Sequence, residues 1–134
     1  MKKYRFSVCI FPLIALVLEM LPYGAVLRFA NPEAEAIRRT FSYFDPTPFG
    51  YANFAPFLTA LCSVGAITLC IIACIRHKRN LYKVTVVLCA ITLVLSLCPL
   101  MIGVKFFSVI GALISVSWAL ATCICFGYYK KLKK

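Results

Sequence analysis

Four long runs of hydrophobic residues, separated by short polar segments, dominate the pattern along the chain. A helix needs about 20 mostly apolar residues to cross ~30 Å of hydrocarbon. Within lipid the backbone must satisfy its own hydrogen bonds, and the alternating pattern of a membrane β-barrel is absent. The chain therefore predicts an all-α, polytopic membrane protein, a four-transmembrane-helix bundle forming a single domain over residues 1–134. The predicted spans are residues 6–27, 54–75, 84–101 and 106–128.

The longest polar segment, residues 28–53, connects the first two predicted spans and is expected to be structured. Asn31 followed by Pro32 is typical of a helix start, because asparagine caps helices and proline fits their first turn. Acidic residues follow near this start and arginines come later, which is the order that the helix dipole favours. The pattern predicts a short helix that ends near Thr40.

Basic residues are distributed unevenly between the two sides of the predicted bundle. Eleven lie before the first span, between the second and third, or after the fourth, and four lie on the other side. The first set is Lys2, Lys3, Arg5, Arg76, Lys78, Arg79, Lys83, Lys130, Lys131, Lys133 and Lys134; the second is Arg28, Arg38, Arg39 and Lys105. Cytoplasmic segments of membrane proteins carry the excess of Lys and Arg. We therefore expect a multi-pass protein of the cell membrane with both termini in the cytoplasm and the first loop outside.

The composition agrees with this class and argues against nucleic-acid binding. Hydrophobic residues make up 63% of the chain, against ~45–50% in soluble proteins. The net charge of +11 comes from clusters that flank apolar runs, which is a topology signal and not a phosphate-binding surface. The expected partners are the lipid bilayer, anionic headgroups at the cytoplasmic face, and a second copy or another membrane protein.

Aromatic residues crowd the second half of the outer loop. Seven of the nineteen in the chain lie between residues 41 and 57. They are Phe41, Tyr43, Phe44, Phe49, Tyr51, Phe54 and Phe57. This cluster is typical of an interfacial belt at the lipid headgroups. It also fits a docking surface for a protein, lipid or hydrophobic ligand.

Eight cysteines are the first candidates for chemistry. None lies in the outer loop and no CxxC pair occurs, so a loop disulfide is not expected. Six fall in the cytoplasmic half of the predicted bundle, and several thiols at one depth could hold a soft metal such as Cu(I). These six are Cys9, Cys70, Cys74, Cys89, Cys123 and Cys125.

The spacing of the small residues favours a packing role over a metal site. Small side chains recur every four residues along the second and fourth spans, and such ridges let membrane helices approach closely. The ridges are Cys62, Ala66, Cys70 and Cys74 in the second span, and Gly111, Ser115, Ala119 and Cys123 in the fourth. Cysteine here is expected to serve as a small apolar residue, and no metal or other cofactor is predicted.

Glu19 is the ionisable residue that lies well inside a predicted span. A carboxyl at this depth is costly and needs a partner or a proton. Counting ~1.5 Å per residue brings Ser63, Ser96 and Ser115 to nearly the same depth, where they could form a polar layer around it. This layer is the candidate site for ligand or proton binding. A structural hydrogen bond, or an ion pair with Arg28, is the alternative.

A single glutamate in the first of four helices is similar to the arrangement in small multidrug resistance transporters. The resemblance covers this residue, the helix count and the size, and it implies proton or cation coupling at Glu19. The one-sided charge departs from that family's dual-topology members, and the other motifs of the family do not appear. The layout of the spans is also similar to claudin-like tetraspan proteins, without their loop cysteine pair and tryptophan motif.

Motifs of the common enzyme classes are absent from the chain, including HExxH, GxSxG and the glycine-rich loops that hold phosphates or dinucleotides. The single histidine, His77, stands among basic residues with no carboxylate near it in sequence. We therefore expect a non-enzymatic accessory or interaction subunit of a cytoplasmic membrane. A small proton- or cation-coupled transporter that uses Glu19 is the alternative.

Overall fold

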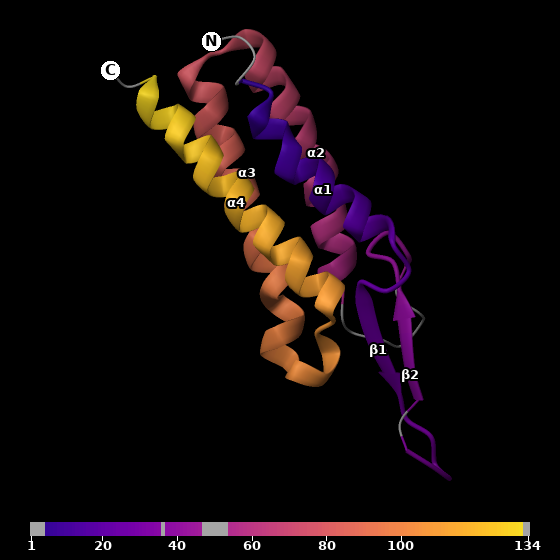
Figure 1. Cartoon of the computed structure of the whole chain (residues 1–134). Coiled ribbons are helices and arrows are strands. Elements are labelled where there is room, and N and C mark those ends of the chain that lie inside the picture. Colours follow the sequence, from indigo (N-terminus) through magenta and orange to yellow (C-terminus); the bar gives the residue numbers. More distant parts are fainter. Residues whose placement is uncertain (1–4, 36, 47–53, 133–134) are drawn as a thin grey trace.

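The computed structural model describes residues 5–35, 37–46 and 54–132, and most of them are helical (Figure 1). Four helices and a two-stranded β-hairpin follow one another along the chain. The helices are α1 (Ser7–Met20), α2 (Ala55–Arg76), α3 (Arg79–Ile102) and α4 (Val109–Lys131). The strands β1 (Ala25–Phe29) and β2 (Ile37–Phe41) lie between α1 and α2, and a short 3-10 turn, η2 (Val104–Phe106), precedes α4.

Three of the four predicted apolar runs form long helices, which confirms that part of the prediction. Helices α2, α3 and α4 have 22, 24 and 23 residues and are long and apolar enough to cross a membrane. The fourth apolar helix, α1, has 14 residues. At ~1.5 Å per residue it extends for about 21 Å, less than the ~30 Å of a hydrocarbon core.

The prediction that the first helix continues to residue 27 is wrong, because α1 ends at Met20. Leu21 has extended backbone angles (φ −70°, ψ 138°). Pro22 contributes to this end, since a proline ring disfavours the helical region for the residue before it. Pro12 stays within α1, whereas Pro22, which the sequence places in the first span, lies beyond its end.

The predicted helix in the outer loop is also wrong, because the segment forms an antiparallel hairpin. Ala25 pairs with Phe41 and Phe29 with Ile37 across the two strands. The side chain of Asn31 does accept a hydrogen bond, from the amide of Glu33 at 3.3 Å, but it stabilises the turn between the strands. An asparagine can therefore start a turn by the same bond with which it caps a helix. The all-α prediction holds for the four helices and fails for this loop.

Tyr43 fastens the hairpin to the bundle. Its side chain is buried, and its amide donates a hydrogen bond to the carbonyl of Glu19 at 3.0 Å. An added Cβ on Gly24 would lie 3.0 Å from the tyrosine ring, so the absence of a side chain there makes room for it. On the other side, the Ser108 hydroxyl donates to the Gly24 carbonyl at 2.6 Å and accepts from the Gly111 amide at 2.9 Å.

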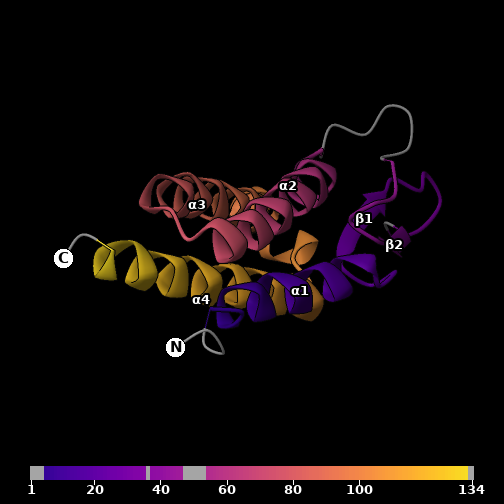
Figure 2. The same ribbon diagram turned by 90° about the horizontal axis from the view of Figure 1, so that it is seen from above.

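The helices pack in two layers, with α1 beside α4 and α2 beside α3 (Figure 2). The start of α1, the end of α4 and the α2–α3 link lie at one end of the bundle (Figure 1). The hairpin and the α3–α4 link lie at the other end. This arrangement agrees with the antiparallel neighbours that the short links predict.

Several residues used in the sequence analysis lie outside the described ranges. They are the terminal lysines Lys2, Lys3, Lys133 and Lys134, and the loop aromatics Phe49 and Tyr51.

Candidate functional site

The centre of the bundle holds a buried carboxyl group with two hydrogen-bond donors on one of its oxygens. Glu19, near the end of α1, is 0% exposed. Its Oε1 accepts from the Ser63 hydroxyl of α2 at 2.7 Å and from the Trp118 indole nitrogen Nε1 of α4 at 3.1 Å. One carboxyl oxygen thus connects three helices.

The second oxygen of Glu19, Oε2, is buried without a hydrogen-bond partner among the described residues. Arg28, considered from the sequence as an ion-pair partner, lies on β1 and does not hydrogen-bond to this oxygen. Ser63 also lies 2.7 Å from the carbonyl of Thr59, and its one hydroxyl hydrogen serves both acceptors. A proton on Oε2 would leave Oε1 free for its two donors.

Of the three serines predicted to surround Glu19, the structure brings one into contact with it. Ser96 and Ser115 hydrogen-bond to each other at 2.9 Å instead, joining α3 to α4. The Ser96 hydroxyl also lies 2.7 Å from the Leu93 carbonyl, and the Ser115 hydroxyl 3.0 Å from the Gly111 carbonyl, so one of the two hydroxyls shares its hydrogen between two acceptors. The predicted polar layer is thus two separate groups of hydrogen bonds. Trp118, which the sequence analysis left out of the site, completes the group around Glu19.

The predicted ridge on α2 lies mostly in the interior, whereas the one on α4 runs from the interior to the surface. On α2, Cys62 is half-buried and Ala66, Cys70 and Cys74 are buried. On α4, Gly111 and Ser115 are buried, Ala119 is half-buried and Cys123 is exposed. A four-residue step rotates about 40° past a full turn of 3.6 residues, so each ridge winds around its helix, and the two differ in where they start relative to the buried face. The buried stripe of α4 instead continues through Ala121 to Cys125.

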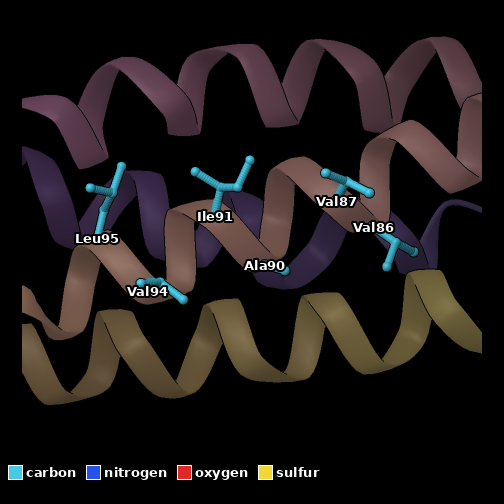
Figure 3. Close-up of a pocket in the computed structure, with 6 residues that line it drawn as sticks. All are labelled: Val86, Val87, Ala90, Ile91, Val94 and Leu95. Atoms are coloured by element: carbon cyan, nitrogen blue, oxygen red, sulfur yellow. The ribbon is translucent and has the colours of Figure 1, made fainter.

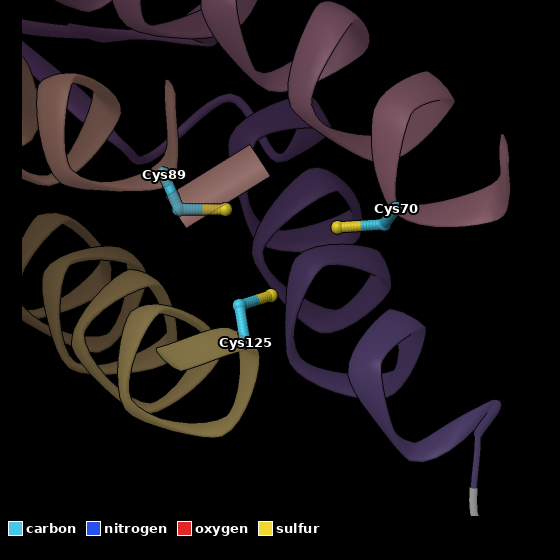
Figure 4. A group of neighbouring side chains, drawn as sticks. All are labelled: Cys70, Cys89 and Cys125. Carbon is cyan, nitrogen blue, oxygen red and sulfur yellow. The ribbon is translucent and has the colours of Figure 1, made fainter. Parts of the chain in front are cut away.

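Thiols form two groups in the half of the bundle that contains the α2–α3 link. Cys70 of α2, Cys89 of α3 and Cys125 of α4 point toward one another (Figure 4). Their three Sγ atoms all lie within 4.8 Å of one another, and all three residues are buried. Nearby, the Sγ atoms of Cys9 and Cys74 are 3.7 Å apart. The sequence places these five thiols in one half of the bundle but does not show which of them meet.

The loop aromatics that the structure describes turn partly inward. Tyr43 is buried, and Phe41 and Phe44 pack against the core, whereas Phe54 remains 54% exposed. Burial, and to a lesser degree the nearby Glu19 carboxyl, raises the pKa of the Tyr43 phenol, which therefore stays neutral. At least half of the described cluster thus supports the fold and is not free to bind a partner.

Among the described residues, Tyr82 and not a carboxylate is the recorded side-chain partner of His77, the single histidine of the chain. His77 ends α2 in a left-handed conformation (φ 48°), and its Nδ1 lies 3.4 Å from the Tyr82 hydroxyl.

Comparison with models of protein families, with curated proteins and with solved structures finds no match to this chain. The geometry of these groups is therefore the basis for the function proposed below.

Proposed function

We propose that the chain is an integral membrane protein that acts as a non-enzymatic interaction subunit. The observation that carries the membrane part of this proposal is the inverted polarity of the bundle, and the surface of α3 described below supports the interaction. Large apolar side chains are exposed along the helices, among them Val87, Val94 and Met101, the last at 88%. The carboxyl of Glu19 is buried, and so are the hydroxyls of Ser63, Ser96 and Ser115. Lipid is the solvent in which apolar residues outside and polar residues inside are stable.

The proposed orientation places the end with the α2–α3 link in the cytoplasm, because the basic residues gather there. A topology reporter fused after Lys134 should then be active only in the cytoplasm. The same reporter inserted in the hairpin turn at Glu33 should be active only outside. An external signal from the C-terminal fusion would reverse this orientation.

Helix α3 offers a surface suited to a partner helix. It has the smallest buried share of the three long helices. A groove of about 460 Å³ runs along it, lined on two neighbouring ridges by apolar residues (Figure 3). The lining residues are Val86, Val87, Ala90, Ile91, Val94 and Leu95. Helices pack by inserting ridges into such grooves, and the β-branched residues lose little rotamer freedom on contact.

The occupant that we propose for this groove is a transmembrane helix of another membrane protein, with acidic residues beside its cytoplasmic end. Helix α3 begins with exposed Arg79 and Lys83, and its first turn contains no acidic residue. A second copy on the same face would bring these like charges together. A partner with carboxylates at the level of Arg79 and Lys83 would pair with these two cations. Such charge complementarity increases both the specificity and the rate of association.

A photo-crosslinking residue at Ile91 tests this surface. Ile91 is 47% exposed in the groove, and Val64 on α2 is a matched control, at 50% exposure and the same number of residues from the basic link. We expect the probe at position 91 to join one apolar segment flanked by acidic residues, and the probe at 64 to join lipid. Ala90→Phe, which fills the groove, should remove the adduct while the helical content stays unchanged.

Two outcomes would overturn the partner assignment. Adducts that contain peptides of this chain would show that a second copy occupies the groove. Adducts with lipid alone at position 91 would show that the groove is an ordinary lipid-facing surface.

One observation favours proton- or cation-coupled transport as a second candidate. Oε2 of Glu19 is buried without a partner among the described residues, which leaves it able to hold a proton or a ligand. Three surface hollows are lined by residues other than Glu19: the groove on α3, one beside Phe41 and Pro56, and one beside Tyr23 and Arg38. We rank the interaction subunit first because the groove on α3 is an observed surface, whereas Glu19 lines none of these three hollows.

A further inference from the structure

Three thiols from three different helices converge inside the bundle, at Cys70, Cys89 and Cys125 (Figure 4). Each sulfur comes from a residue in the buried face of its helix, and the three residues are 0% exposed. Packing alone explains a small residue at each position. It does not require that all three sulfur atoms point to a common centre, which makes them a set of possible ligands.

The dimensions of the cluster fit a metal ion with three ligands. With metal–sulfur bonds of ~2.3 Å, as in zinc thiolate sites, three sulfurs in a trigonal plane lie about 4.0 Å apart. The three Sγ atoms here lie within 4.8 Å of one another. A contraction of less than about 1 Å, within the reach of small χ1 rotations, brings them to binding distance.

The number and type of ligands select the ion. Thiolate sulfur is soft and favours Cu(I), Zn²⁺ and iron–sulfur clusters. Structural zinc takes four ligands in a tetrahedron, and this group contains three. Cu(I) has a filled d shell and readily takes three soft ligands in a plane. We propose that Cys70, Cys89 and Cys125 form a trigonal binding site for Cu(I) within the membrane-embedded part of the bundle.

Binding of Cu⁺ is coupled to the release of protons, because cysteine binds a metal as the thiolate. Each of the three thiols loses its proton, and no electron is transferred. The ion brings one positive charge and the released protons remove three, so the net charge of the site falls by two. Such buried charge is costly at this depth, about two helical turns from the basic end of α2, so the affinity for Cu⁺ is expected to rise with pH.

The chain supplies a matched control for every ligand. Each of the three helices also carries a cysteine outside the cluster that can serve as its control: Cys62 on α2, Cys98 on α3 and Cys123 on α4. Cys123 is separated from Cys125 by one residue. A variant with Cys70, Cys89 and Cys125 all changed to Ala can therefore be compared with one in which Cys62, Cys98 and Cys123 are changed. Both lose the same number of thiols from the same helices.

The experiment titrates the full chain in detergent with an acetonitrile complex of Cu(I) under anaerobic conditions, against a chromophoric Cu(I) chelator. We expect one equivalent in the natural chain and in the control variant, and loss of it in the cluster variant. Removing an outer-shell partner of a metal costs ~10–100-fold in affinity, so removing one ligand by Cys125→Ser should cost more than about 100-fold. X-ray absorption of the loaded natural chain should show three sulfurs at ~2.3 Å.

The absorption measurement needs no variant, so it decides the coordination even if the cluster variant fails to fold. Fewer than three sulfurs around copper, or no copper bound by the natural chain, overturns the site. Copper retained by a folded cluster variant also overturns it, because the ion then binds other thiols, of which Cys9 and Cys74 are the pair in contact. Loss of copper from the control variant would show that binding depends on thiols outside the cluster.

Discussion

Replacing Glu19 by lysine is expected to prevent the helices from assembling. The Ser63 and Trp118 donors point at Oε1, and a lysine ammonium has three donors and no acceptor. In the proposed membrane setting a lysine costs up to ~2.5–3.5 kcal/mol, the value for a helix centre, and each buried donor left unpaired costs ~1–3 kcal/mol more. The total approaches the ~5–15 kcal/mol that stabilises a whole domain. Size-exclusion chromatography in mild detergent should show aggregation or no recovered protein.

Two milder substitutions distinguish a structural from a transport role. Glu19→Gln keeps an acceptor for both donors and should cost about 1 kcal/mol or less, whereas Glu19→Ala leaves the Trp118 indole unpaired and should cost about 2 kcal/mol or more. Trp118 is the single tryptophan of the chain, so its fluorescence reports directly on this contact during thermal unfolding. If Glu19 couples transport to protons, Glu19→Gln should fold normally and lose that transport.

Met20→Lys is the matched control for the charge. Met20 follows Glu19 at the end of α1 and is 64% exposed, so a lysine there can extend its ammonium to the interface. This variant should assemble normally. Normal assembly of Glu19→Lys would show that position 19 is accessible to water or to headgroups, and that the buried carboxyl is not a feature of the protein in the membrane.

The long helices could be predicted from the sequence because length and apolarity are properties of a continuous segment. The ends of α2, α3 and α4 differ from the predicted spans by five residues or fewer. The end of α1 could not be found by hydropathy alone, since the residues from 21 to 27 continue the apolar run without a charged side chain. Pro22 contains the missing signal, and its effect on Leu21 is steric and not hydrophobic.

The hairpin is hard to predict because β1 continues the apolar run of the first predicted span, whereas β2 carries charged residues in the order typical of a helix end. The segment from Ile37 to Phe41 contains two exposed arginines and reads as a helix end, yet it pairs with β1 along its whole length. Its partner strand supplies the reason, because Ala25, Val26 and Leu27 are buried and hold the hairpin against the bundle. Pairing between segments that are distant in sequence overrides the local preference of either one.

Depth along a helix can be counted from sequence, whereas rotation about its axis cannot. Counting residues brought Glu19 and Ser63 to one level, and they do meet. The same counting put Ser96 and Ser115 at that level, but they face each other. The meeting of Cys70, Cys89 and Cys125 depends on the rotation of three helices, which explains why the sequence favoured packing for each cysteine taken singly.

Replacing Tyr43 by alanine is expected to detach the hairpin from the bundle. Tyr43 is 1% exposed, and its ring lies against Gly24 while its hydroxyl is next to Gly111. Truncating a buried aromatic residue to alanine costs ~3–5 kcal/mol, because the cavity that it leaves closes only partly. The hydrogen bond that the amide of residue 43 donates to the Glu19 carbonyl would become more exposed to solvent as well. Hydrogen exchange at the amides of β1 and β2 should accelerate strongly, while exchange in α3 changes little.

Tyr23→Ala is the control, since Tyr23 also lies between α1 and α2, next to the hairpin, but is 61% exposed. It should change the free energy of hairpin opening, obtained from the exchange rates, by less than about 0.5 kcal/mol, as surface substitutions do. Tyr43→Phe separates the ring from the hydroxyl: the ring fills the space over Gly24, so this variant should keep most of the protection. Equal exchange in Tyr43→Ala and the natural chain would show that β1 and its contact with Ser108 hold the hairpin without the tyrosine. Unfolding of α1 together with the hairpin would show instead that Tyr43 stabilises the end of α1, and through it the position of Glu19.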